Sequence, residues 1–467
     1  MKQSDRGFVF QTVNGNLYYY NDVDGSVIPW VCIENERKRA SHDDNLMVSS
    51  VSNNKEKLNT NNEFESALKK EGYNQLLLIV TEECNLRCKY CAFSGEYPNN
   101  RTHNNVFMKW ETANKAIKLF YEGYYSVKSI KPNLIPAISY YGGEPLLNFP
   151  LIKKITGLVN QLFPEKVHFN LTTNGTILTN EMLDFFIMND YFLTFSLNGY
   201  QREHDRLRIF DDGTGTYDIV WTTLQKIRNK NPNYYEKYCG ISTVYDYGTD
   251  LDKLYVFFKN REWLLPKYFR LGLISGDFTQ WYSRYSAYDR ERFFSSLRFL
   301  KELYIQQIET GIRPDKFLQQ LCGRELQHIL NRTQGVVEKN ILLPYTATCL
   351  PGSKIAVYPD GSLHCCERIN QQFSIGNVET GIDKDLVDSL LKKYKEQIIE
   401  DCTTCPITRL CNICFSSVGS SGKFEKSPFD YCSIWLETMK SSFSLLWTLY
   451  EKGVTEDTIS PDRPVIN

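Results

Sequence analysis

The stretch TEECNLRCKYCAFSGEYPNN, from Thr81 to Asn100, places three cysteines in a CxxxCxxC pattern directly after an apolar run. They are Cys84, Cys88 and Cys91. A structural zinc site needs a fourth ligand close by, and disulfides need an even number of thiols. The odd number fits neither use directly, so these cysteines require another explanation.

Length and composition exclude several classes of protein. A chain of 467 residues can bury a substantial core and needs neither disulfides nor metals merely to stay folded, so its 14 cysteines require a further role. Lys and Arg number 54 against 55 Asp and Glu. This balance argues against a broad basic face, and we expect no nucleic-acid partner.

The amino-terminal residues MKQSDRGFVFQTVNGN contain no apolar core of signal-peptide length, and no later segment approaches the length of a bilayer span. We therefore expect a cytoplasmic protein without a membrane partner. Cytosolic thiols stay reduced, so clustered cysteines there more often bind metal or take part in redox chemistry than form disulfides.

Hydrophobic patterning predicts two or three short strands between Phe8 and Trp30, then a polar linker and a short helix over Glu36–Lys70. Buried strands then alternate with helical segments such as Glu111–Tyr124 and Glu181–Asn189, which predicts a parallel α/β sheet, open or closed as a barrel. The predicted strands are QLLLIV (Gln75 to Val80) and those within AISYYGGE, VHFNLTTNG, YFLTFSLNG and YCGISTVYD.

Unusual residues follow the carboxyl ends of these strands. The cysteine triplet, GGEP (Gly142 to Pro145), TTNG (Thr172 to Gly175) and SLNG (Ser196 to Gly199) each come just after a strand. Parallel α/β folds build their active sites at this edge of the sheet. We expect all four stretches to line one site.

CxxxCxxC with Tyr90 before its last cysteine, followed in order by GGEP, TNG and SLNG, resembles the radical S-adenosylmethionine (SAM) enzymes. The resemblance covers roughly Leu76 to Arg270 and implies a partial (β/α)6 TIM-like barrel. It also implies that the three cysteines ligate a [4Fe-4S] cluster whose fourth iron chelates S-adenosylmethionine. Reductive cleavage of that molecule yields a 5′-deoxyadenosyl radical, chemistry that proteins delegate to cofactors.

The same resemblance implies roles in binding S-adenosylmethionine. Gly142 and Gly143 would allow close approach to its methionine moiety, and Glu144 would accept a hydrogen bond from its amino group. Arg208 would pair with its carboxylate, or else be a surface helix cation. The remaining expected cofactor-binding residues are Tyr90, Asn174, Ser196 and Asn198. The alternative for the triplet is a zinc site completed by His103 or a distant cysteine.

A second cysteine-rich region, from about Thr346 to Trp435, has the order C…GxxxxC…CxxCxxxxxC…C and resembles the SPASM domain, which holds two auxiliary [4Fe-4S] clusters. One departure is that two residues, not three, separate Cys411 from Cys414. Zinc ribbons are the alternative use of such CxxC pairs. By resemblance one cluster is ligated by Cys402, Cys405, Cys411 and Cys432, and the other by Cys349, Cys366 and Cys414.

The fourth ligand of this other cluster stays open between Cys365, Cys322 and a substrate thiolate. Glu367, directly after Cys366, occupies the position of an acidic base in sulfatase-maturating relatives, so it would take a proton during the reaction. Its alternative is a surface pair with Arg368.

Four regions are expected: an N-terminal β-rich segment and linker (1–70), the barrel (71–335), the auxiliary-cluster domain (336–440) and a C-terminal helix and tail (441–467). The first is similar to segments that capture a leader peptide by strand addition, although a cap over the barrel is the alternative.

The resemblance extends to maturases of ribosomally made, cysteine-rich peptides. It implies a precursor peptide with a leader as substrate, a reducing protein such as flavodoxin or ferredoxin, and a thioether (sactionine-type) crosslink to cysteine as product. The alternatives are an anaerobic sulfatase-maturating enzyme that forms formylglycine, a maturase that forms carbon–carbon links or epimerises a residue, and a non-enzymatic iron–sulfur electron carrier or zinc-ribbon protein.

Overall fold

The computed structural model describes residues 6–32, 60–335, 348–426 and 430–460. Most of the expected linker after Glu36 lies outside these ranges, and its helical end is α2 (Thr60–Glu71). Within the described residues no helix combines the length and apolarity needed to cross a bilayer.

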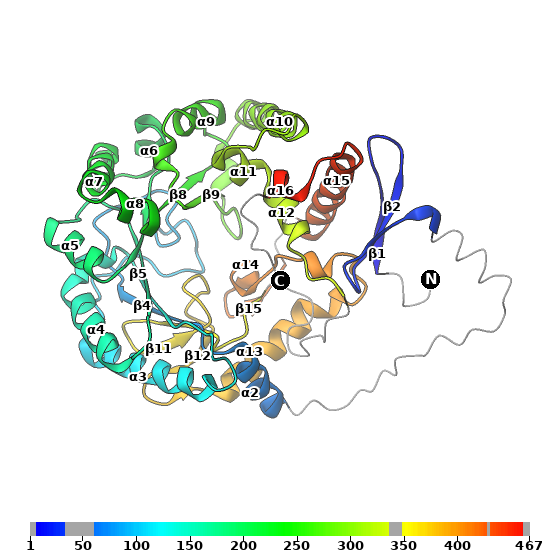
Figure 1. Ribbon diagram of the computed structural model, residues 1–467. Helices are drawn as coiled ribbons and strands as arrows, with labels where there is room; N and C mark the ends of the chain where they lie inside the picture. The colour runs from blue at the N-terminus through cyan, green and yellow to red at the C-terminus, as the bar shows by residue number, and fades with distance from the viewer. Residues whose placement is uncertain (1–5, 33–59, 336–347, 427–429, 461–467) are drawn as a thin grey trace.

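A curved sheet of parallel strands forms the centre of the molecule, with helices around its convex side (Figure 1). The expected strands and their parallel order are confirmed, and the sheet stays open, as in a partial barrel. The parallel strands are β4 (Gln75–Thr81), β5 (Ala137–Gly142), β6 (His168–Thr173), β7 (Phe192–Ser196), β8 (Cys239–Tyr245) and β9 (Tyr268–Leu273).

Helices connect these strands and cover them, as right-handed crossovers between parallel strands require. The helices of this region are α3 (Trp110–Val127), α4 (Phe149–Leu162), α5 (Asn180–Met188), α6 (Gln201–Leu207), α7 (Tyr217–Lys230), α8 (Pro232–Tyr238), α9 (Leu251–Lys259), α10 (Ala287–Glu309), α11 (Lys316–Cys322) and α12 (Arg324–Leu330).

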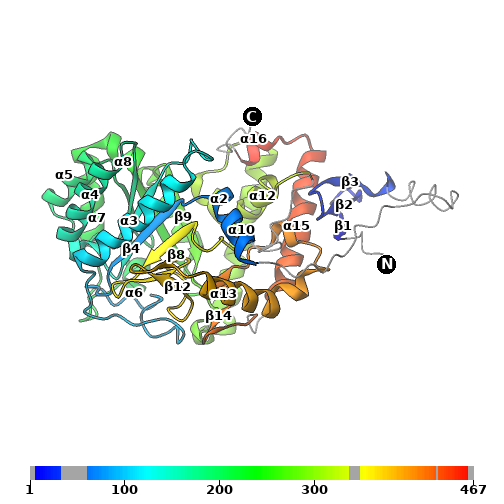
Figure 2. The same ribbon diagram turned by 90° about the horizontal axis from the view of Figure 1, so that it is seen from below.

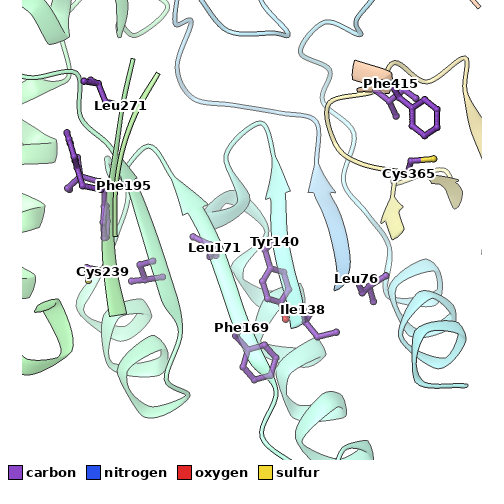
Figure 3. Close-up of a cluster of buried hydrophobic side chains, with 14 of the residues drawn as sticks. Leu76, Ile138, Tyr140, Phe169, Leu171, Phe195, Cys239, Leu271, Cys365 and Phe415 are labelled. Carbon is purple, nitrogen blue, oxygen red and sulfur yellow. The ribbon is translucent and has the colours of Figure 1, made fainter. Parts of the chain in front are cut away.

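Side chains alternate along the strands between a core under the helices and the concave side of the sheet. In β7, Leu193 and Phe195 are buried in the core, whereas Thr194 and Ser196 line a cavity. Figure 3 shows part of this core, including Leu171 and Phe195 on their strands. The concave side is therefore a polar cavity rather than a filled barrel interior.

The C-terminal region continues the same sheet. Strand β10 pairs in parallel with β4, and three antiparallel strands follow it, so the sheet has ten strands from β13 to β9. These C-terminal strands are β10 (Lys354–Val357), β11 (Ser362–His364), β12 (Ser374–Asn377) and β13 (Gly381–Ile382).

Beyond this sheet the chain forms a short hairpin and several helices. Helix α15 runs through the expected boundary at residue 440 and begins one residue before Cys432. The elements are α13 (Lys384–Gln397), α14 (Phe415–Val418), β14 (Gly419–Ser420), β15 (Lys423–Phe424), α15 (Tyr431–Glu451) and α16 (Glu456–Ile459).

The N-terminal segment forms a three-stranded antiparallel sheet, as expected, from β1 (Gly7–Gln11), β2 (Leu17–Asn21) and β3 (Val27–Pro29). It packs on α15, as Figure 2 shows, with the Phe8 and Phe443 ring centroids 5.5 Å apart. No residue of these strands lines a cavity of the barrel. These strands therefore do not reach the two cavities, and the role of the segment stays a prediction.

Candidate active site

The cysteine loop begins where β4 ends. Cys84 and Cys88 are buried and Cys91 is partly buried. Backbone N–H groups point at two of the sulfurs, with Leu86 N 3.4 Å from Cys84 Sγ and Phe93 N 3.4 Å from Cys91 Sγ. Such hydrogen bonds stabilise thiolate ligands of iron–sulfur clusters.

Burial raises the pKa of the Cys84 thiol to about 12 and that of the Cys91 thiol to about 11. Without a bound cation these thiols are protonated at neutral pH, and metal binding would release their protons. Among the described residues, no three His, Cys, Asp or Glu side chains gather closely enough to hold a single metal ion. The three thiols line one side of a cavity of about 480 Å³, which fits a ligand larger than one ion.

The glycines of GGEP hold the cysteine loop against the end of β5. Gly142 has φ of 153°, and a Cβ there would lie 2.1 Å from Thr81 O. A Cβ at Gly143 would lie 2.0 Å from Glu83 O, and the Gly143 N–H donates to Thr81 O over 3.0 Å. Both positions therefore require glycine for a contact within the protein. Their approach to the methionine moiety stays a prediction.

Glu144 joins GGEP to the TTNG loop. Its carboxylate accepts from Thr173 Oγ1 at 2.8 Å, Asn174 N at 2.7 Å and Leu146 N at 3.1 Å. Burial nevertheless raises the pKa of Glu144 to about 7. Asn174 in turn donates from Nδ2 to Asn85 Oδ1 at 2.8 Å, so these contacts join three strand-end loops. The hydrogen bond that Glu144 is expected to accept from the amino group of S-adenosylmethionine remains a prediction.

Arg208, at the end of α6, is 4% exposed, so the alternative of a surface cation is wrong. Its Nη1 donates to Tyr90 OH over 2.6 Å, while its Nε has no partner. Burial opposes its charge, but the nearby Cys88 thiol and Tyr90 keep the pKa of Arg208 above its ordinary value. No carboxylate of the described residues lies within ion-pair distance, so this guanidinium fits the carboxylate of an amino-acid moiety.

The two expected residues of SLNG are placed differently. Ser196 lines the cavity with Tyr90 and Asn174. Asn198 is fully buried outside the cavity lining, and its Oδ1 accepts from Val244 N over 3.2 Å. Its visible contacts therefore hold the loop between β7 and α6.

The C-terminal cysteines are described as two neighbourhoods, Cys402, Cys405, Cys411 and Cys432 in the first and Cys349, Cys366 and Cys414 in the second, and their division between two clusters stays a prediction. The thiol of Cys411 is close enough to be influenced by the charges of its three expected companions, Cys402, Cys405 and Cys432. In the second neighbourhood Cys349 is influenced by Cys414 in the same way. The ligand roles themselves are not tested by these positions.

The two cysteines considered as a fourth ligand, Cys365 and Cys322, lie in different parts of the structure. Cys365 lies next to the second neighbourhood, where Cys366 and Cys349 influence its thiol, but it is 2% exposed and belongs to the hydrophobic core (Figure 3). Cys322 ends α11 near Tyr304 and Glu325 and lies apart from both cysteine neighbourhoods. Cys322 is therefore not positioned as a ligand.

Glu367 lies in the cavity wall, where Lys354 is a closer ion-pair partner than Arg368. Its Oε2 accepts from Lys354 Nζ at 2.5 Å, whereas Arg368 Nε lies 3.8 Å from its Oε1. Burial favours the neutral acid, but the Lys354 ammonium outweighs it and holds the pKa of Glu367 below its ordinary value. Glu367 is thus ionised and can accept a proton, although the ion pair weakens it as a base.

A second cavity, of about 530 Å³, continues from the first. Both are lined by Tyr90, Tyr141 and Glu367, and the second extends to Cys414. We call the first the inner cavity and the second the outer cavity. The outer cavity thus connects the cysteine loop of the barrel with the second neighbourhood of C-terminal cysteines.

Sequence reasoning missed Arg270 and Lys354, which also line the inner cavity. For Arg270 the sequence offered one signal, the period-two pattern of YFRLGL (Tyr268–Leu273). Phe269 and Leu271 are buried in the core under the helices, so Arg270 between them faces the cavity.

Comparisons with known proteins agree with this geometry. A family model of the radical SAM superfamily matches residues 78–253. The chain is 29% identical to an uncharacterized protein of Methanocaldococcus jannaschii, MJ0907, over 36% of this chain and 58% of that protein. It is 25% identical to a cysteine-type anaerobic sulfatase-maturating enzyme of Clostridium novyi, over 40% of this chain and 48% of that protein. The chain thus spans about half the length of these curated relatives.

Solved structures share the fold over more of the chain. The structure of anSMEcpe with bound AdoMet has a TM-score of 0.60 at 19% identity and covers 83% of this chain and 97% of its own. The same protein with bound AdoMet and the Cp18Cys peptide has a TM-score of 0.57 and covers 81% of this chain and 99% of its own. The match to the radical SAM superfamily, over residues 78–253, covers the cysteine loop and the GGEP, TTNG and SLNG stretches of the site.

Proposed function

We propose that the protein is a radical SAM peptide maturase that joins a substrate carbon to a cysteine sulfur as a thioether. The observation that carries this proposal is the outer cavity, which runs from Tyr90 and Ala92 beside the barrel cysteines to Cys414. A peptide in this cavity would present one residue to the inner cavity and a second residue toward the C-terminal cysteines. A crosslinking reaction needs this arrangement, because it brings two substrate groups together.

The inner cavity would hold the cofactors. Cys84, Cys88 and Cys91 would ligate a [4Fe-4S] cluster, and Arg208 would bind the carboxylate of S-adenosylmethionine. When bound, this pair would supply a radical that removes a hydrogen atom from a substrate carbon. The remaining lining residues, Tyr90, Asn174 and Ser196 among them, would orient the bound molecule and exclude water.

The substrate C–H and S–H bonds break and a C–S bond forms. The hydrogen atom leaves with 5′-deoxyadenosine, the thiol proton passes to a base such as Glu367, and one electron is left for an iron–sulfur cluster. The two cysteine neighbourhoods of the C-terminal region would hold two auxiliary [4Fe-4S] clusters, and a flavodoxin or ferredoxin would supply the electron for each cleavage.

The N-terminal sheet would capture the leader of the precursor peptide. Its strands lie in the order β1-β2-β3, so β1 and β3 form its edges, and an added strand needs such an edge. Because the sheet is docked on α15, a leader bound there would be fixed relative to the cavities. Removal of the leader should then weaken precursor binding without changing the cleavage of S-adenosylmethionine.

Mass spectrometry tests the proposal. A short cysteine-bearing peptide encoded beside the gene would be incubated anaerobically with reconstituted enzyme, S-adenosylmethionine and reductant, and then alkylated. Loss of a pair of hydrogen atoms for each link, with a thiol that no longer alkylates, is the expected result. An unmodified peptide beside abundant 5′-deoxyadenosine would refute the substrate assignment and leave the radical enzyme.

Formylglycine formation is the second candidate, because the Clostridium novyi relative is named as a sulfatase-maturating enzyme and the fold matches anSMEcpe. It predicts a single modified residue that reacts with carbonyl reagents, in a peptide copied from a sulfatase. Carbon–carbon crosslinking leaves the thiols free to alkylate, and epimerisation leaves the mass unchanged, so the same assay separates all of these outcomes.

A further inference from the structure

The wall shared by the two cavities has a net positive charge. Three charged side chains line both cavities, namely Arg270, Glu367 and Arg368. Glu367 is already paired with Lys354 at 2.5 Å. With Lys354 included, three cations face one anion at this junction, which leaves an excess of two positive charges.

Arg270 has no counter-ion among the residues that the structure describes. No carboxylate comes within 4.0 Å of its guanidinium, although it stands on a strand whose alternate residues are packed in the core. Arg270 is exposed into the cavities, and partial desolvation there, followed by the positive charges of Arg368 and Arg324, holds the pKa of Arg270 below its ordinary value. Arginine nevertheless stays charged in proteins, so this repulsion favours binding of an anion.

Arg368 can also bind an anion, because its nearest carboxylate already has another partner. Its nearest carboxylate, Glu367, lies 3.8 Å away and is engaged by Lys354, and the Arg368 side chain is 56% exposed. Arg101 of the outer cavity differs in this respect, because it lies 3.5 Å from Glu82, a carboxylate partner within the protein. Arg270 and Arg368 are thus two guanidinium groups that face one space without a dedicated carboxylate.

S-Adenosylmethionine does not account for these two residues. Its carboxylate is assigned to Arg208, which is close to Cys84, Cys88 and Tyr90. Arg270 is influenced by Tyr141, Tyr268 and Arg368, and it also lines the outer cavity, which Arg208 does not. The anion at the junction therefore belongs to the molecule that enters through the outer cavity.

We propose that Arg270 and Arg368 bind a carboxylate of the peptide substrate, so that the residue presented at the junction is acidic or carries the free carboxyl terminus. This inference rests on the proposed function, because it names the chemistry of the same peptide. Planar guanidinium groups bind carboxylates through paired hydrogen bonds, and an aspartate side chain and a carboxyl terminus offer the same group.

Binding of synthetic probes tests the assignment separately from product formation. Fluorescein-labelled hexapeptides Gly-Gly-Asp-Cys-Gly-Gly and Gly-Gly-Asn-Cys-Gly-Gly, each as the amide and as the free acid, would be titrated with reconstituted protein and followed by anisotropy. A side-chain site predicts roughly tenfold tighter binding of the Asp amide than of the Asn amide. A carboxyl-terminal site predicts the same preference for the Asn free acid over the Asn amide.

Four variants sharpen the test. Arg270→Gln and Arg368→Gln should each remove the preference for carboxylate, Arg270→Lys should retain part of it, and Arg298→Gln on the outer side of α10 should leave it unchanged. Iron content and far-UV circular dichroism show whether each variant is folded, and binding of S-adenosylmethionine should be unaffected in Arg298→Gln, which lies outside both cavities.

Two results would overturn the assignment. One is equal binding of carboxylate and amide probes by the unaltered protein, including no binding of either. The other is a matching loss of S-adenosylmethionine binding in Arg270→Gln. If the carboxylate preference appears but no peptide is ever crosslinked, the thioether proposal fails and the anion site stands.

Discussion

The cysteines of the barrel and those of the C-terminal region are positioned by different kinds of contact. Cys84, Cys88 and Cys91 lie within one loop. The end of β5 holds that loop through backbone contacts, and the Asn174 side chain after β6 donates to Asn85 within it. The C-terminal cysteines come from separate segments between Cys349 and Cys432, and several of them are exposed or half-buried. The first site is therefore built by neighbouring strands of one sheet, whereas the second depends on segments distant in sequence.

The N-terminal sheet supplies one of these distant contacts. The Asp22 carboxylate accepts from Thr408 Oγ1 and, at 2.9 Å, from Arg409 N, within the turn that precedes Cys411. Arg409 Nε donates back to Asp22 O over 3.1 Å.

Because the two sets of cysteines are held by different contacts, damage to one set should leave the other set intact. The following predictions test this independence.

Replacement of all three barrel cysteines by alanine should have the largest effect. Cleavage of S-adenosylmethionine should be abolished, because no protein ligand to the catalytic cluster remains, while the iron bound by the C-terminal region should be retained. Chromatography of 5′-deoxyadenosine and iron analysis measure the two properties. Cys32→Ser, at an exposed thiol, is the control. Retained cleavage in the triple variant would show that the catalytic site lies elsewhere.

Gly143→Ala should affect the barrel site alone. Its Cβ would lie 2.0 Å from Glu83 O and 2.9 Å from Cys84 N, so the cysteine loop must shift. Overpacking of this kind costs about 1–3 kcal/mol of stability, and the displaced loop should lower the cleavage rate by roughly tenfold or more, because the cluster ligands no longer hold their positions.

The matched control for this variant is Gly157→Ala. Gly157 is an exposed helical glycine in α4 where a Cβ would meet nothing within 4 Å. The control should keep full activity and gain slightly in stability. Equal rates in both variants would contradict the close approach of the two loops.

Asp22→Ala should have the opposite selectivity. Loss of a buried acceptor for Thr408 and Arg409 should cost about 2 kcal/mol of stability and lower the auxiliary iron content, with the barrel iron and its cleavage activity retained. Asp24→Asn is the control, since its side chain can still accept the hydrogen bond from Ser26 N, 2.8 Å long. A parallel loss of both kinds of iron in Asp22→Ala would refute the independence of the two sites.

A smaller effect concerns pH. The pKa of Glu144 is raised from 4.5 to about 7, so the folded protein binds more protons than the unfolded chain between these values. Its contribution to the free energy of unfolding should fall as the pH rises through this window, by up to about 3 kcal/mol.

Glu144→Gln should remove this component, because glutamine does not titrate. Urea unfolding of the cluster-free protein at pH 4.5, 6 and 7.5 measures it, with the unaltered protein in parallel. An identical pH dependence in the two proteins would contradict burial of this carboxyl group.

Much of the barrel could be predicted from the sequence because its signals are local. Strand periodicity located β4 to β8, and the loops after these strands were expected at one site, where Cys84, Glu144, Asn174 and Ser196 now line one cavity. The roles of Gly142 and Gly143 in packing on the cysteine loop were not foreseen, because the partner atoms belong to another strand.

Other features depend on contacts between distant segments. Arg270 is a single arginine in a short strand without a motif, so only the three-dimensional position of β9 places it in the cavity wall. Likewise, nothing in the sequence near Asp22 indicates its bond to Arg409. Burial of Arg208 also depended on packing, and local patterning could not distinguish it from a surface cation.

The most direct test of the central claim is cleavage of S-adenosylmethionine by the anaerobically reconstituted protein under strong reductant, with its iron content measured in the same sample. The account predicts formation of 5′-deoxyadenosine and methionine in equal amounts, and none from the protein with Cys84, Cys88 and Cys91 replaced by alanine. Full iron content without any cleavage would contradict it and would favour an iron–sulfur electron carrier.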